Sequence, residues 1–241
     1  MDRYMQFIDK LIVYLPAYKH IDNIISVYLA GSVSRGDYIV EASDIDIYVI
    51  CKDQDSNLNN SFDGYVQNIA GEFLAEIMNW YPDVVSIAFT TYEAIKNGSS
   101  FLGKGADYYS FIDSGRLIYG VEIKNEIIKT DDEQNREIAE QVLKQLKEIV
   151  NQDIPKELTT RYFIRGVFGL VFSAVHSLLV IRGIYLRGKE ELVKELFKYD
   201  KVNGEKMQAI YAFWLEFAEG TLTEEDKLSL VKVVREVVMS L

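Results

Sequence analysis

Hydrophobic and polar positions alternate with two different periods in the first part of the chain. Segments 4–15 and 65–80 place apolar residues three or four positions apart, which is typical of helices packed on a core, and Pro16 and Pro82 follow them. The polar segment 52–60 predicts a loop. Runs rich in β-branched and aromatic residues predict three strands, at 24–30, 45–51 and 84–90. This order of elements is typical of a small α/β or α+β unit.

The pattern changes after residue 95. Gly98, Gly103 and Gly105 predict a loop, and the short apolar segment 116–121 predicts an edge strand. From residue 131 onward the apolar spacing is helical almost throughout, with a connection at 151–155. The predicted helices of this part are 133–150, 162–184, 190–199, 205–219 and 223–240. Thr223 and Asp226 have the spacing of a capping box at the start of the last helix.

Composition narrows the classes of partner. The chain has 241 residues, of which 49% are hydrophobic, enough for a sizeable core. It carries 26 basic and 37 acidic residues, a net charge of −11, whereas binding along a nucleic-acid backbone needs clustered Lys and Arg. We therefore expect no nucleic-acid partner. The acidic balance suits a cationic substrate, although solvated helix faces explain it equally simply.

Cysteine usage and hydropathy indicate the compartment. Cys51 is the only cysteine, so no internal disulfide can form and a reducing compartment is expected. The first residues do not read as a signal peptide. The longest uncharged run, 166–181, is shorter than the roughly 20 residues that span a bilayer. We expect a cytoplasmic protein without a membrane partner, in which this run forms a buried core helix.

Two carboxylates on one predicted strand are the first chemical signal. Asp44 and Asp46 are two positions apart, so both point to one face, while Ile45 and Ile47 point into a core. Adjacent carboxylates repel each other, and a divalent cation relieves this repulsion. Mg²⁺ takes oxygen ligands, uses few carboxylates and completes its shell with water and substrate phosphates. The pair therefore predicts a Mg²⁺ site that is also catalytic.

The preceding turn supplies the second signal. The strand 24–30 ends at Gly31, where the lack of a side chain lets a ligand approach the backbone. Ser32 adds a hydroxyl donor, and Arg35 adds a positive charge one helical turn later. A helix starting here would present free N–H groups to an anion. Together these residues predict a nucleoside triphosphate whose phosphates sit on the Gly31–Ser32 turn and bridge to metal held by the carboxylates.

Segment 28–50, YLAGSVSRGDYIVEASDIDIYVI, resembles the signature of the DNA polymerase beta-like nucleotidyltransferase superfamily. Similar motifs occur in aminoglycoside and lincosamide nucleotidyltransferases and in minimal nucleotidyltransferases that act as antitoxins. The resemblance implies that Gly31 and Ser32 bind the triphosphate and that Asp44 and Asp46 bind one or two Mg²⁺ ions. With the order of elements it predicts an α+β fold: a small mixed-sheet nucleotidyltransferase domain at 1–125, then a C-terminal helical bundle at 126–241.

The function that this resemblance implies is transfer of a nucleoside monophosphate. ATP or another NTP is the expected co-substrate, with adenylyl transfer favoured. A hydroxyl of a small molecule, such as an aminoglycoside-like antibiotic, is the expected acceptor. A homodimer also fits the pattern.

One position departs from the family. Members often carry a third carboxylate on the next strand, where this chain has Ser86. A serine does not act as a base at neutral pH without help. Asp83 and Glu93 flank the strand but lie away from the expected position. The alternative function is therefore a nucleotide-binding, antitoxin-like or interaction protein with weak or lost catalysis.

Three features of the helical half have alternative interpretations, one structural and one functional. His176, in the apolar helix, reads as a core histidine bonded to a backbone carbonyl rather than as a catalyst. The apolar stripe Leu228, Val231, Val234, Val237 and Val238 fits either a docking surface or the bundle core. Six basic residues between 151 and 189 could face the triphosphate or cap and pair helices: Lys156, Arg161, Arg165, Arg182, Arg187 and Lys189.

Overall fold

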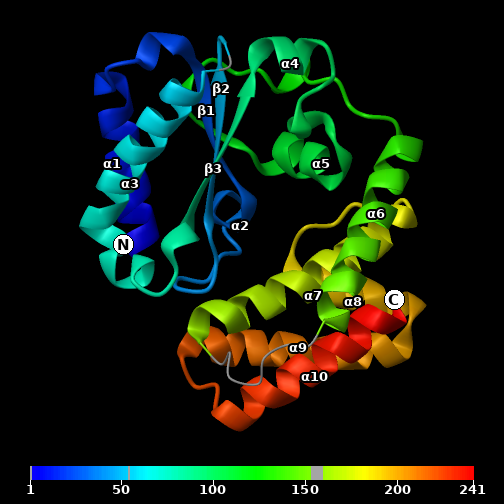
Figure 1. Cartoon of the computed structure of the whole chain (residues 1–241). Coiled ribbons are helices and arrows are strands. Elements are labelled where there is room, and N and C mark those ends of the chain that lie inside the picture. Colours follow the sequence, from blue (N-terminus) through cyan, green and yellow to red (C-terminus); the bar gives the residue numbers. More distant parts are fainter. Residues whose placement is uncertain (1, 54, 153–159) are drawn as a thin grey trace. The chain divides into compact units, whose positions relative to one another are not determined.

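The computed structural model describes residues 2–53, 55–152 and 160–241, and the chain divides into two compact units, Met1–Thr130 and Asp131–Leu241 (Figure 1). The division expected after residue 125 falls within the 3-10 turn Lys124–Glu126 of the first unit. The Thr130 N–H donates to the Gly103 carbonyl at 2.7 Å, which joins the following segment to this unit. The connection expected at 151–155 lies partly outside the described residues, and Lys156 lies wholly outside them.

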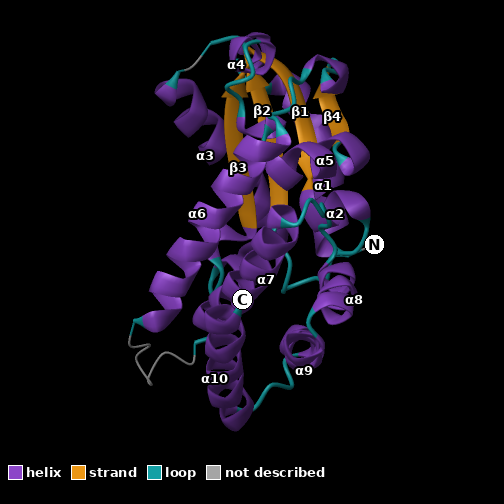
Figure 2. Ribbon diagram, turned by 90° about the vertical axis from the view of Figure 1, so that its right-hand side faces the viewer, coloured by secondary structure: helices purple, strands orange, loops and turns teal. Residues whose placement is uncertain are grey.

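A mixed four-stranded sheet forms the centre of the first unit in its described residues. The strands are β1 (Ile24–Ala30), β2 (Ile45–Cys51), β3 (Val85–Thr91) and β4 (Arg116–Gly120), in the order β3-β2-β1-β4. Strand β1 is antiparallel to β2 and β4, whereas β2 is parallel to β3 (Figure 2). The strands lie at or within one residue of the predicted segments, and the α+β fold class is confirmed.

Helices cover both faces of this sheet (Figure 1). Helices α1 (Arg3–Tyr14) and α3 (Ser56–Met78) pack on one face and form the larger core with the inward side chains of β1 and β2. Helices α4 (Tyr92–Lys96) and α5 (Gly105–Ser114) pack on the other face, where a smaller core surrounds Tyr28.

Helices α3 and α5 begin where loops were predicted. Helix α3 begins at Ser56 rather than at 65, because the Asp55 side chain accepts the Asn57 N–H at 2.8 Å and caps the helix. The predicted loop 52–60 is thus wrong over its second half, which is helical and buries Leu58. The loop predicted around Gly105 is also wrong, because α5 begins there and buries Phe111.

The second unit is helical in its described residues. Its helices are α6 (Asp132–Asn151), α7 (Arg161–Ile181), α8 (Lys189–Tyr199), α9 (Lys201–Glu219) and α10 (Glu224–Ser240). By length and composition α7 could cross a membrane, yet about half of it is buried among the other helices of this unit, and Phe168 stacks edge-on against Trp214 at 5.2 Å. That burial is the behaviour of a core helix.

Helix α10 shows the predicted capping box. The Thr223 side chain accepts the Asp226 N–H at 3.2 Å, and the Asp226 carboxylate accepts the Thr223 N–H at 2.9 Å. Of the apolar stripe on α10, Val234, Val237 and Val238 are buried, so the bundle core accounts for them.

Candidate functional site

The turn after β1 is a single short helix, α2 (Gly31–Arg35). Gly31 has φ +65° and Gly36 has φ +82°, in the left-handed region that glycine adopts without strain. The Gly36 N–H donates to the Ser32 carbonyl at 2.9 Å and closes the turn. The predicted helix start after the strand is therefore present, and it lasts five residues.

Asp46 lies directly against this turn. The register pairs Ala30 with Asp46 across the antiparallel strands β1 and β2. A β-carbon built on Gly31 would stand 1.9 Å from Asp46 Oδ2. The Asp46 carboxylate thus occupies the space that any other side chain at position 31 would need.

Burial alternates from residue 44 to residue 47. Ile45 and Ile47 are fully buried in the larger core, while Asp44 and Asp46 are partly exposed. Asp46 belongs to the same face of the sheet as its cross-strand neighbour Ala30. Two carboxylates with partial access to water are a donor set that Mg²⁺ accepts, because the ion keeps several waters and takes few protein ligands.

The third strand contributes no carboxylate to this place. The parallel register pairs Asp46 with Ser86, whose side chain is exposed. Asp83 lies in the 3-10 turn before β3, at the same end of the sheet, whereas Glu93 lies beyond its opposite end. Among residues 2–53, 55–152 and 160–241, no group of three His, Cys, Asp or Glu residues could hold a metal ion.

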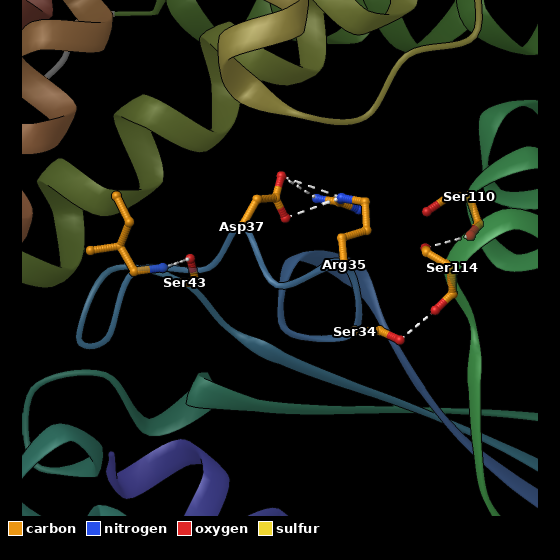
Figure 3. Close-up of polar contacts among 7 residues, drawn as sticks. Ser34, Arg35, Asp37, Ser43, Ser110 and Ser114 are labelled. Atoms are coloured by element: carbon orange, nitrogen blue, oxygen red, sulfur yellow. Dashed lines mark hydrogen bonds and ion pairs between the residues drawn. The ribbon is translucent and has the colours of Figure 1, made fainter. Parts of the chain in front are cut away.

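Polar contacts tie α2 to its surroundings (Figure 3). The Ser34 hydroxyl donates to the Ser114 carbonyl at the end of α5. Arg35 pairs with Asp37, with Nε 3.1 Å from the carboxylate. Ser32 is buried, with 8% of its surface exposed. The guanidinium is thus held beside the turn by its own neighbour, and a ligand phosphate would have to compete with Asp37 for it.

Cys51 and His176 are both largely buried groups with shifted pKa values. Burial raises the pKa of the Cys51 thiol to about 11, so it remains a protonated core group. Burial, aided by the positive charge of Arg187, lowers the pKa of His176 to about 3. Its Nε2 is buried and has no hydrogen-bond partner in the described residues.

Three of the six basic residues in 151–189 lie over aromatic rings of the helical unit. The charged group of Arg161 is 5.4 Å from the Phe217 ring, and that of Arg182 is 5.1 Å from the Tyr199 ring. Lys189 Nζ is 4.6 Å from the Trp214 ring. Cation–π contacts of this kind stabilise the bundle, which supports a structural role for these three side chains.

Comparisons with known proteins agree with the fold and the motif. Residues 13–118 match the family described as nucleotidyltransferase domain, a range that runs from α1 to β4 and includes every predicted site residue. No curated protein matches the chain by sequence. Among solved structures, the chain is similar to spectinomycin adenyltransferase AAD(9) from Enterococcus faecialis, determined with ATP and spectinomycin. That similarity has a TM-score of 0.55 at 12% identity and covers 97% of this chain and 98% of the other, which supports the fold of both units.

Proposed function

We propose that this protein is a Mg²⁺-dependent enzyme that transfers a nucleoside monophosphate from ATP or another NTP to a hydroxyl of a small molecule, because residues 13–118 match the nucleotidyltransferase domain family. The observation that carries the proposal is the contact between Asp46 and Gly31. It joins a carboxylate able to hold metal to the turn able to receive phosphates. Adenylyl transfer is the favoured reaction.

The site residues have different roles in binding the metal and the nucleotide. Asp44 and Asp46 hold Mg²⁺, which when bound neutralises charge on the phosphates. Gly31 lets the triphosphate approach the backbone closely, and Ser32 donates its hydroxyl. Arg35 supplies positive charge next to the turn, shared with Asp37. The protein thus positions the nucleotide and stabilises charge, which is most of what phosphoryl-group chemistry requires.

The proposed reaction is a substitution at the α-phosphorus and involves no change of oxidation state. The acceptor hydroxyl oxygen forms a bond to the α-phosphorus, and the bond from that phosphorus to the bridging oxygen of the β-phosphate breaks. Pyrophosphate leaves with the electron pair of the broken bond, and the hydroxyl proton passes to solvent or to a base on the acceptor. Ser86, beside Asp46, offers no carboxylate for that proton, so we expect a slower enzyme than one with a complete carboxylate set.

An aminoglycoside-like antibiotic is the proposed acceptor class. The similar AAD(9) structure holds ATP and spectinomycin, and the net charge of −11 favours a cationic substrate. A cytoplasmic location follows from this proposal, since ATP is the co-substrate. No nucleic acid or membrane is required.

The proposal is tested first by nucleotide binding. Calorimetry with ATP, GTP, CTP and UTP, with and without Mg²⁺, should show one preferred nucleotide whose binding needs metal. Asp46→Asn and Asp44→Asn should each weaken that binding by about tenfold or more, because a metal ligand is lost. Asp63→Asn, an exposed carboxylate on α3, is the matched control and should bind as wild type. Absence of binding by the wild type with every nucleotide overturns the proposal.

Transfer is tested separately with labelled nucleotide and a panel of aminoglycosides. A labelled antibiotic product with equimolar pyrophosphate identifies the acceptor. The alternative, a nucleotide-binding protein with lost catalysis, is favoured by Ser86 in place of a carboxylate. It predicts metal-dependent binding without pyrophosphate release for any acceptor.

A further inference from the structure

The turn that precedes Asp44 has an unusual backbone. The N–H groups of Ala42 and Ser43 both donate to the Ile39 carbonyl, at 3.1 and 2.8 Å. The Ser43 hydroxyl accepts the Ile39 N–H at 3.0 Å and closes the turn from the other side (Figure 3). Within it Glu41 has φ +68°, a left-handed conformation that a residue with a β-carbon adopts only at a cost of about 1–2 kcal/mol.

A buried tyrosine from the first helix holds this turn. Tyr4 is fully buried, and its hydroxyl donates to the Ser43 carbonyl at 2.6 Å and accepts the Glu41 N–H at 3.2 Å. These two hydrogen bonds join positions about 40 residues apart in the chain. A strained backbone persists only where the surrounding structure holds it. The Tyr4 hydroxyl holds this turn through its hydrogen bonds to the backbone of Glu41 and Ser43.

The position of Tyr4 is itself fixed. Its ring stacks on that of Tyr38 at 5.8 Å with 14° between the planes. The Tyr38 hydroxyl donates to the Asp2 carboxylate at 2.5 Å, and Asp2 caps α1 by accepting the Met5 N–H at 3.0 Å. The Tyr4 hydroxyl therefore has little freedom to move away from the turn.

Asp44 depends on this turn more than Asp46 does. Asp46 is held in the sheet by pairing with both Ala30 and Ser86. Asp44 lies before β2, outside the strand pairing, which begins at Ile45. The backbone that sets the direction of the Asp44 carboxylate is the peptide that follows Ser43.

We propose that Tyr4 is a positioning residue for the metal site: its hydroxyl fixes the Glu41–Ser43 turn and so sets Asp44 beside Asp46 for Mg²⁺. The proposal rests on the function proposed above. Tyr4 touches neither metal nor substrate and acts only through the backbone that carries Asp44. Partners that orient metal ligands in this way usually influence metal affinity strongly.

The test compares two buried tyrosines that lose equivalent hydrogen bonds. Tyr4→Phe removes one donated and one accepted hydrogen bond next to Asp44. Tyr28→Phe is the matched control, because the Tyr28 hydroxyl donates to Glu122 Oε1 at 2.7 Å and accepts the Ile123 N–H at 2.8 Å. Tyr28 is also fully buried. The two variants should lose similar thermal stability.

ATP binding by calorimetry is measured over a series of Mg²⁺ concentrations. Tyr4→Phe should need about tenfold more Mg²⁺ for half-saturation, with metal-free ATP affinity unchanged. Tyr28→Phe should keep the wild-type Mg²⁺ dependence. If Tyr4 had a merely structural role, Tyr4→Phe and Tyr28→Phe would show the same Mg²⁺ dependence of ATP binding. Should Tyr4→Phe fail to fold, Ser43→Ala, which removes the acceptor of the Ile39 N–H, must show the same shift.

The outcomes separate the two proposals. If wild type shows Mg²⁺-dependent binding and Tyr4→Phe titrates like it, the role of Tyr4 is refuted and the proposed function stands. If wild type shows no Mg²⁺-dependent nucleotide binding, the proposed function fails and the role of Tyr4 with it.

Discussion

The carboxylate of Asp46 fills the space beside the α-carbon of Gly31, where a β-carbon would stand 1.9 Å from Oδ2. Position 31 therefore needs glycine for two independent reasons, its φ of +65° and this close approach. Because the two residues belong to adjacent antiparallel strands and their turn, the phosphate side and the metal side of the proposed site share one contact.

Gly31→Ala should abolish Mg²⁺-dependent ATP binding, since the new methyl group displaces the Asp46 carboxylate. Gly36→Ala is the matched control: Gly36 also has positive φ, but nothing lies within 4 Å of a β-carbon there. We expect it to lower the free energy of unfolding by only about 1 kcal/mol and to keep ATP binding. Equal loss of binding in both variants would show that backbone strain, not the Asp46 contact, matters.

Ser86→Glu should raise Mg²⁺ affinity, because the register places the new carboxylate beside Asp46. An increase on the order of tenfold is expected for an added charged ligand, measured by Mg²⁺ titration of ATP binding. Ser86→Gln has the same length without the charge and should leave the affinity unchanged. Identical titrations of the two variants would mean that position 86 does not face the metal.

His176 should make the stability of the helical unit sensitive to acid. Its pKa is about 3 in the folded protein against an ordinary value of 6.5, so the unfolded chain takes up a proton first as the pH falls. This contribution to the free energy of unfolding is present in full above pH 6.5 and decreases as the pH falls to about 3. The decrease is at most about 1.4 kcal/mol per pH unit.

Urea unfolding between pH 7 and pH 4 checks this. His176→Leu should flatten the pH dependence relative to wild type. His20→Gln, which changes an exposed histidine of the first unit, should leave it unaltered. An unchanged slope in His176→Leu would contradict the burial of this imidazole.

Two glycines of the helical unit should respond to alanine in opposite directions. A β-carbon on Gly204 would stand 2.5 Å from the Phe197 α-carbon, so Gly204→Ala should destabilise the unit by about 1–3 kcal/mol through overpacking. Gly169, in α7, has nothing within 4 Å of that position. Gly169→Ala should stabilise by about 0.5–1 kcal/mol through helix propensity. An unchanged or raised urea midpoint for Gly204→Ala would refute the close packing of Gly204 on α8, and a lowered midpoint for Gly169→Ala would refute the open space at Gly169.

Local patterns in the sequence were sufficient for the strands and for the alternation that separates Asp44 and Asp46 from Ile45 and Ile47. These signals depend on near neighbours along the chain, so a single sequence carries them. The first turns of α3 and all of α4 and α5 were not predicted from these patterns. Leu58 in the first turn of α3 and Phe111 in α5 are buried by tertiary packing, which local patterns do not reveal.

The sequence by itself determined the strands of this protein, the helical character of its second half and the residue types of its proposed site. Only the tertiary structure decided that Gly31 faces Asp46, that Ser86 lies next to that carboxylate, and that Tyr4 holds the turn before Asp44. Those relationships join residues brought together by strand pairing and core packing, and no local preference of the chain encodes them.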